Sequence, residues 1–233
     1  MRIGSIRGTQ IHVEPSFLIV VALFVILNME SAGGQFRHAL LWAPLLFFSV
    51  LIHEIGHAAT LGALGFGPSY IALAGFGGVT INQRRAEPWQ DILVSIAGPI
   101  CSFVLAAIAF VLLVFIPYFQ GDPFFAAFLP LVIVANVFWG IFNLLPIHPL
   151  DGGNALRSLL RHFLSPRTAE VGSSWISILF SVGILGLALF AGQWFIAIFA
   201  AMFAHQNFQR LQMINKLQDP ETRSDDEKRD QNE

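Results

Sequence analysis

The sequence predicts an all-α polytopic membrane protein with about six transmembrane helices and a small β-hairpin loop near its candidate site. Three observations lead to this prediction. The 233 residues are 55% hydrophobic and only 12% charged, whereas a typical soluble domain is about 25% charged. Six apolar segments follow one another, and several reach the roughly 20 residues that a membrane helix needs. A glycine-rich stretch after the second segment cannot continue a helix.

The apolar segments give the order of the spans. The first, from about Pro15 to Met29, is short and can extend back through Ile11 and Val13. The sixth, from Trp194 to about Phe208, is also short. The four between them are long enough to cross a bilayer, and they cover residues 39–61, 92–119, 124–145 and 171–190.

Two smaller elements and a tail complete the expected organisation. In the loop after the second span, Tyr70 to Leu73 and Val79 to Ile81 are expected to form two short strands around a glycine-rich turn, beside the candidate site. Residues 151–163 have the pattern of a short amphipathic helix. Residues 217–233 are polar, charged and without aromatic side chains, which predicts a disordered cytoplasmic tail after a single membrane-embedded domain, residues 1–216.

Positive charge alternates between the two sides of the predicted spans. Lysines and arginines lie before the first span and after the second, fourth and sixth, while the other loops carry almost none. The positive-inside rule then places both termini in the cytoplasm. We therefore expect a multi-pass protein of the cell membrane.

The segment His53-Glu54-Ile55-Gly56-His57 lies inside the second span. On a helix, HExxH places two histidines on one face, where both can ligate one zinc ion, and places the glutamate as a general base. Ionisable groups are costly inside a membrane, so three within five residues need a reason, and a metal supplies one. On the predicted orientation, His57 lies roughly 6 Å and His53 roughly 12 Å from the cytoplasmic end of the span.

A catalytic zinc site needs three protein ligands and an open position. The candidate third ligand is Asp151, which follows the fourth span at a break made by Pro146 and Pro149. The alternative is that Asp151 caps the following helix, and the two roles need not exclude each other. His148 could be a spare ligand or a hydrogen-bonding partner of one, although a loop histidine that faces water is the favoured interpretation.

Together, the two motifs resemble those of site-2 proteases, the intramembrane zinc metalloproteases that cleave transmembrane segments in regulated intramembrane proteolysis. The resemblance rests on HEIGH in one span and on Asn143-x-x-Pro146-x-x-x-Leu150-Asp151-Gly152 at the end of another. It extends to Ala97-Gly98-Pro99 and Gly77-Gly78-Val79, and covers roughly residues 45–159. A PDZ-like insertion or a CBS domain does not fit in 233 residues, so we expect a compact member from a bacterial or archaeal membrane.

The resemblance implies one zinc ion per chain, held by His53, His57 and Asp151, with Glu54 as general base. It also implies that Asn143 positions substrate or stabilises the oxyanion, although a structural hydrogen bond between helices is the alternative. The implied substrate is a transmembrane segment of another protein, which unwinds in the bilayer and adds a strand to the hairpin. Many members have an asparagine three residues after Gly-Pro, where this chain has Ser102, so the resemblance carries no helper role to that position.

Two other classes of function could use the same ligand set. A membrane metal transporter or sensor would need a relay of polar residues across the whole membrane, and we do not expect one from the mainly apolar third, fifth and sixth spans. An inactive membrane scaffold would have no use for Glu54. Nucleic-acid binding has no support, because there is no basic patch with interleaved aromatic residues. The sequence therefore favours an intramembrane zinc metalloendopeptidase, and leaves its oligomeric state open.

Overall fold

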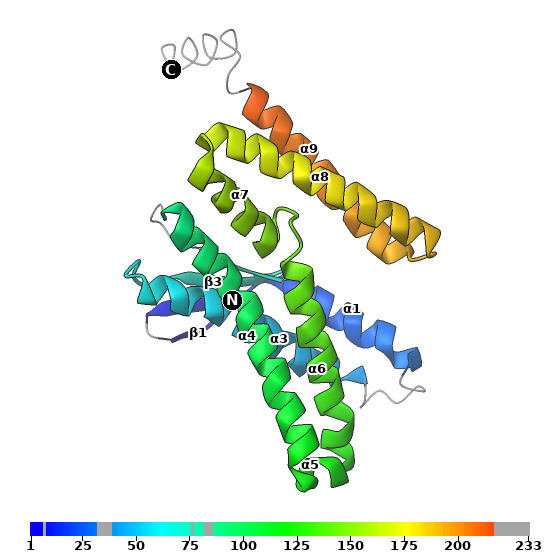
Figure 1. The fold of residues 1–233 in the computed structure, drawn as a ribbon. Helices are drawn as coiled ribbons and strands as arrows, with labels where there is room; N and C mark the ends of the chain where they lie inside the picture. Colours follow the sequence, from blue (N-terminus) through cyan, green and yellow to red (C-terminus); the bar gives the residue numbers. More distant parts are fainter. Residues whose placement is uncertain (7, 32–38, 76, 82–85, 217–233) are drawn as a thin grey trace. The chain divides into compact units, whose positions relative to one another are not determined.

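The computed structural model describes residues 1–6, 8–31, 39–75, 77–81 and 86–216 (Figure 1). It divides into two compact units, Met1–Leu144 and a second that begins at Leu145. The predicted tail, residues 217–233, lies outside the described residues, and the single domain 1–216 stays a prediction.

The described residues of the first unit form five helices, most of which begin at a proline. Pro15, Pro88, Pro117 and Pro123 each open a helix, where the missing N–H costs nothing because that donor has no partner within the helix. Helix α3 packs against α4, and α4 against α6. The helices are α1 (Pro15–Ser31), α3 (Trp42–Ala63), α4 (Pro88–Phe115), the short α5 (Pro117–Gly121) and α6 (Pro123–Asn143).

As far as residue 216, the second unit contains three helices: α7 (Asp151–Phe163), α8 (Pro166–Phe190) and α9 (Trp194–Lys216). Helix α7 has the bounds that its amphipathic pattern predicts. Helices α8 and α9 form an antiparallel hairpin and pack along each other (Figure 1). The buried residues of α8 are small, mainly serines, which allows the two helices to approach closely.

Four described helices are long and apolar enough to cross a membrane: α3, α4, α6 and α8. They correspond to the four spans that the sequence predicts at full length. Helix α1 contributes a shorter apolar segment, Pro15–Asn28. The chain is therefore a multi-pass membrane protein, while the count of six spans stays a prediction.

A four-stranded sheet completes the first unit, in the order β1-β2-β3-β4. The predicted hairpin is confirmed as β3 (Tyr70–Ala74) and β4 (Gly77–Ile81), which pair antiparallel. Two further strands were not predicted from the sequence: β1 (Arg2–Ile6) and β2 (Thr9–Val13), which pair antiparallel with each other. Strand β2 then joins β3 in parallel and so connects the two hairpins.

The prediction that the first span extends back through Ile11 and Val13 is wrong. Both residues belong to β2, where they pair with Ile71 and Leu73 of β3. Their alternation with polar neighbours is the period-2 pattern of a strand buried on one face. Pro15 then ends the strand and opens α1, because it cannot donate a ladder hydrogen bond.

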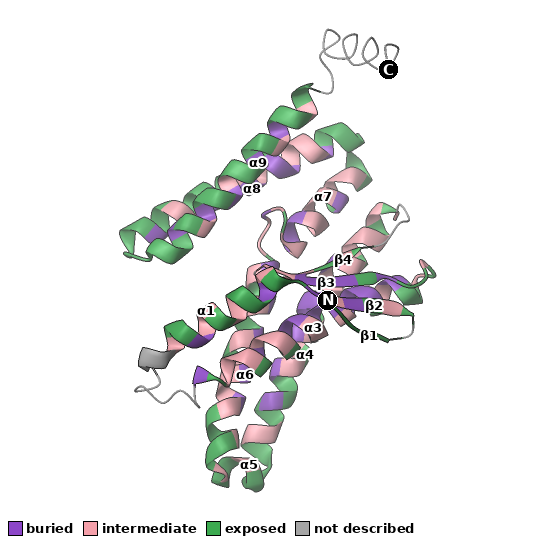
Figure 2. Ribbon diagram, turned by 180° about the vertical axis from the view of Figure 1, so that it is seen from behind, coloured by how far each residue is buried: buried purple, intermediate pink, exposed green. Residues whose placement is uncertain are grey.

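The sheet packs against the helix that carries the HEIGH segment. Ile11, Val13, Ile71 and Leu73 are buried in one cluster with Phe17 of α1 and with Val50 and Ala58 of α3. Figure 2 shows this burial along β2 and β3, the middle strands of the sheet. The apolar face of the sheet therefore fixes β4 beside α3.

Gly56 sets how closely α3 approaches α4. A Cβ atom on Gly56 would lie 2.7 Å from the Ala97 carbonyl oxygen and 2.8 Å from Cys101 Sγ, both on α4. Gly62, on the same helix, has no atom within 4 Å of such a Cβ. The two glycines of α3 are therefore a matched pair, one in close contact and one with open space.

We expect Gly56→Ala to lower the thermal unfolding midpoint of the detergent-purified protein, because overpacking costs about 1–3 kcal/mol. Gly62→Ala is expected to leave the midpoint unchanged or raise it, since alanine is a better helix former than glycine by up to about 1 kcal/mol. Equal midpoints for the two variants would contradict the close α3–α4 contact.

Candidate metal centre

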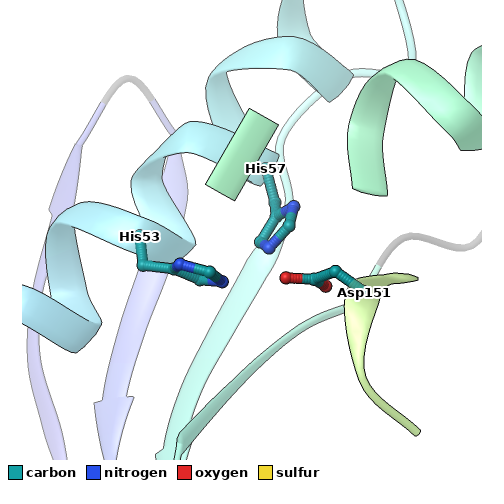
Figure 3. Close-up of side chains that lie close together, drawn as sticks. All are labelled: His53, His57 and Asp151. Atoms are coloured by element: carbon teal, nitrogen blue, oxygen red, sulfur yellow. The ribbon is translucent and has the colours of Figure 1, made fainter. Parts of the chain in front are cut away.

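The two histidines of the HEIGH segment lie on one face of α3, as their spacing predicts. His53 and His57 are both buried, and their ring centroids are 5.0 Å apart. Figure 3 shows the two rings projecting from neighbouring turns of this helix. A helical spacing of four residues thus places two imidazoles on the same face, with their planes at 75° to each other.

Each ring is oriented by a hydrogen bond between its Nδ1 atom and a group of α4. His57 Nδ1 donates to the carbonyl oxygen of Val94 at 2.6 Å. His53 Nδ1 lies 3.0 Å from the hydroxyl oxygen of Ser102, which is fully buried. A carbonyl oxygen can only accept a hydrogen bond, so a neutral His57 carries its proton on Nδ1. Its Nε2 atom then has a free lone pair that can bind a metal ion.

Both Nε2 atoms approach the same point on α4, which is Gly98. A Cβ atom at this position would lie 2.3 Å from His57 Nε2 and 2.7 Å from His53 Nε2. A larger residue would fill the space between the two nitrogen atoms. Two imidazole nitrogens that converge on one small volume, each oriented through its other nitrogen, fit a divalent metal such as zinc.

Glu54 is buried beside the histidines and is held by the β-hairpin. Its Oε2 accepts a hydrogen bond of 2.7 Å from the Thr80 hydroxyl of β4. A Cβ atom on Gly78 would lie 2.3 Å from Glu54 Cγ, so β4 needs glycine to pass this close to the carboxylate. The sheet therefore fixes the side chain that the sequence predicts as general base.

Asn143, the other predicted catalytic residue, is the last residue of α6 and is buried. Its Nδ2 donates to the carbonyl oxygen of Trp139, one turn earlier in the same helix, at 2.9 Å. One hydrogen of the Asn143 side-chain amide is thus bonded within the helix.

Asp151 belongs to the second unit, where it is the first residue of α7. The residue at the N-cap is Leu150, so the structure does not place Asp151 in the capping position that the sequence left as an alternative. Figure 3 labels Asp151 at the start of this helix.

His148 does not behave as a solvent-facing loop histidine. It is half-buried, and its Nδ1 lies 3.2 Å from Asn154 Oδ1. Burial and the nearby Arg210 guanidinium lower the pKa of His148 to about 4. The ring is therefore neutral near pH 7 and its Nδ1–H donates to Asn154, which gives His148 a structural contact within its own unit.

The residues that orient this site were not predicted from the sequence. The sequence indicated no role for Ser102, and the structure places its hydroxyl against His53. Nothing in the sequence singled out Thr80 or the carbonyl oxygen of Val94. The one available signal was the Gly98-Pro99 pair within a span, which marks a close approach of backbone to another group.

Comparison with known proteins identifies the family. The model of Peptidase family M50 matches residues 42–121 and 120–185, which is more than half of the chain. The chain therefore belongs to peptidase family M50, which confirms the resemblance to site-2 proteases.

Individual relatives agree with this assignment. A putative zinc metalloprotease of Synechocystis is 31% identical over 217 residues, covering 85% of this chain and 56% of the relative. A zinc metalloprotease of Methanocaldococcus jannaschii is 30% identical over 192 residues, covering 80% of this chain and 55% of the relative. The chain thus spans about half the length of the curated relatives it matches.

The fold is also that of a solved structure. The site-2 protease from Methanocaldococcus jannaschii superposes with a TM-score of 0.65 at 22% sequence identity, covering 91% of this chain and 94% of that one. At this identity the likeness establishes the fold.

We expect Ser102→Ala to weaken zinc binding about 10- to 100-fold, the usual effect of removing a group that orients a metal-bound histidine. Ser95→Ala removes a buried hydroxyl from the same helix and is expected to change the affinity less than twofold. Competition with a chelator of known affinity measures both. An unchanged affinity in Ser102→Ala would show that His53 needs no support from α4.

Proposed function

We propose that this chain is an intramembrane zinc endopeptidase that hydrolyses peptide bonds in or near the transmembrane segments of other membrane proteins. The observation that carries the proposal is the convergence of the His53 and His57 Nε2 atoms beside a buried glutamate, on a helix long enough to cross a membrane. Membership in a peptidase family supports the same conclusion. Its relatives' names support zinc as the metal.

The proposed ligands are His53, His57 and Asp151. Each offers one atom suited to a metal ion, and the set of two imidazoles and one carboxylate is typical of catalytic zinc sites. Such a site holds one zinc ion per chain and leaves one position open for water or substrate. When bound, zinc supplies Lewis-acid chemistry, because it activates a water molecule and polarises a carbonyl group.

The protein's own residues carry the proton and hold the substrate. The Glu54 carboxylate takes a proton from the attacking water and delivers it to the leaving amine. The hydrogen bond from Thr80 keeps one carboxylate oxygen in place during this transfer. The Asn143 amide assists by positioning the substrate or by donating to the developing oxyanion.

The proposed substrate binds in an extended conformation. A peptide bond in a helix has its carbonyl oxygen engaged, so a transmembrane segment must unwind before water can attack it. Strand β4 is the last strand of the sheet within the described residues, and its Val79 and Ile81 side chains are exposed. An unwound segment can pair with this strand by β-augmentation and so pass close to Glu54.

The proposed setting is the cell membrane of a bacterium or archaeon, with both termini in the cytoplasm. The alternation of lysines and arginines between loops supports this orientation. On this orientation α3 runs inward, so the HEIGH segment lies in the cytoplasmic half of the membrane. The released product would then leave on the cytoplasmic side.

We expect Glu54→Gln to abolish cleavage and to leave the zinc content unchanged, since glutamine keeps the shape but cannot accept the proton. The assay reconstitutes the purified protein with single-span membrane proteins in liposomes and identifies new N-termini by mass spectrometry. Glu14→Gln, an exposed glutamate outside the site, is the control that should cleave like the wild type. Cleavage that persists in Glu54→Gln would refute the general-base role, and metal uptake without any cleavage would favour a transporter.

Thr80→Val should lower kcat about tenfold and leave the zinc content unchanged, because it removes the hydroxyl from Glu54 at nearly constant volume. Thr60→Val is the matched control, since Thr60 Oγ1 donates to its own helix at the Gly56 carbonyl. Equal kcat values for the two variants would show that the sheet does not orient Glu54.

A further inference from the structure

We propose that Ser177 of α8 and Asn207 of α9 are positioning residues: they fix the backbone at His148 and thereby set the place of Asp151. The inference rests on the proposed function in one respect, namely that Asp151 ligates the metal. All the contacts that carry it lie within the second unit.

The loop that precedes α7 has few backbone donors. Pro146 and Pro149 carry no N–H, and the N–H groups of Ile147 and Leu150 bond within the loop, to the carbonyl oxygens of Leu145 and Ile147. His148 lies between the two prolines. Its N–H and C=O need partners from elsewhere in the fold, because unpaired backbone groups are costly when buried.

Two helices that are distant in sequence supply those partners. The His148 N–H donates to Ser177 Oγ at 3.0 Å. The His148 carbonyl oxygen accepts a hydrogen bond from Asn207 Nδ2 at 2.7 Å. The backbone of one loop residue is thus held from both sides, by α8 and by α9.

Both side chains are themselves fixed to their helices. Ser177 and Asn207 are fully buried. The Ser177 hydroxyl can donate to the Ser173 carbonyl oxygen at 2.8 Å, and the second amide hydrogen of Asn207 is donated to the Phe203 carbonyl oxygen at 2.9 Å. Neither side chain can therefore move without breaking a second hydrogen bond. Each thus holds the loop at a fixed place relative to its helix.

The backbone at His148 packs against the first turn of α7 and so fixes where this helix begins. A Cβ atom on Gly153 would lie 2.4 Å from the His148 nitrogen, so the loop backbone lies directly on the first turn of the helix. Asn154 adds contacts from this turn to the His148 ring, at 3.2 Å, and to the Pro149 carbonyl oxygen, at 3.4 Å. Asp151 begins this turn, so its carboxylate is placed by the same contacts.

The other buried serines of α8 provide matched controls. Ser173 donates to the Glu170 carbonyl oxygen of its own helix. Ser181 is equally buried, and its hydroxyl has no hydrogen-bond partner within the described chain. Neither bonds to the loop, so their replacement tests burial on α8 without changing the contact to His148.

The test measures metal affinity with Co²⁺, whose visible absorption reports the ligand set, in the detergent-purified full chain. Ser177→Ala and Asn207→Leu are each expected to weaken Co²⁺ binding about 10- to 100-fold and to change its spectrum. Ser173→Ala and Ser181→Ala should stay within twofold of the wild type. Wild-type affinity and spectrum in both Ser177→Ala and Asn207→Leu would overturn the inference.

Two further arms separate this inference from the proposed function. Asp151→Asn tests whether the carboxylate is a ligand at all, and if it binds Co²⁺ like the wild type, the proposed site fails. Hydrogen exchange of peptides that cover residues 145–154 needs no metal. Strong protection of the His148 amide in the wild type, lost in Ser177→Ala and kept in Ser173→Ala, supports the positioning role even then. A His148 amide that exchanges freely in the wild type would overturn it, whatever the variants do.

Discussion

The close contact between α3 and α4 is the constraint on which the candidate site depends. Imidazole and carboxylate side chains inside a membrane helix are tolerated only where other groups satisfy them. Here α4 supplies those groups, because Val94 and Ser102 orient the two histidines through Nδ1. Two glycines make the contact possible, Gly56 on α3 and Gly98 on α4, since a Cβ atom at either position would collide with the opposite helix. The positions of the two histidine rings of HExxH thus depend on α4 as well as on α3, the helix that carries them.

The sheet adds a second constraint, on the general base. Its buried face packs on α3, which brings Thr80 to the Glu54 carboxylate and lets Gly78 pass close to that side chain. The same strand is the last of the sheet within the described residues. In the proposed mechanism, one element therefore orients the proton acceptor and offers a template for an unwound substrate. This coupling would ensure that only a peptide in extended form reaches the water-activating group.

Features that follow from local pattern could be predicted from the sequence. The four long spans, the β3–β4 hairpin and helix α7 depend on apolar runs, glycine-rich turns and helical periodicity, and the structure has them near the expected residues. Features that depend on distant partners could not be predicted. The residues of β2 resemble part of an apolar span, and only their pairing with β3 shows that they form a strand. A role for the Ser102 hydroxyl follows only from its contact with His53. In the sequence, Ser177 and Asn207 are ordinary polar residues of apolar helices. Only the structure shows that both bond to the backbone of His148.

X-ray absorption of the zinc-loaded, detergent-purified protein can examine the proposed ligands, His53, His57 and Asp151, without a known substrate. We expect about one zinc per chain, with two imidazole nitrogens at about 2.0–2.1 Å and carboxylate or water oxygens at about 2.0–2.2 Å. His57→Ala should lose one nitrogen from the spectrum and most of the zinc. A wild-type protein that stays empty after zinc is supplied, or whose zinc has no imidazole neighbours, would refute the proposed metal site.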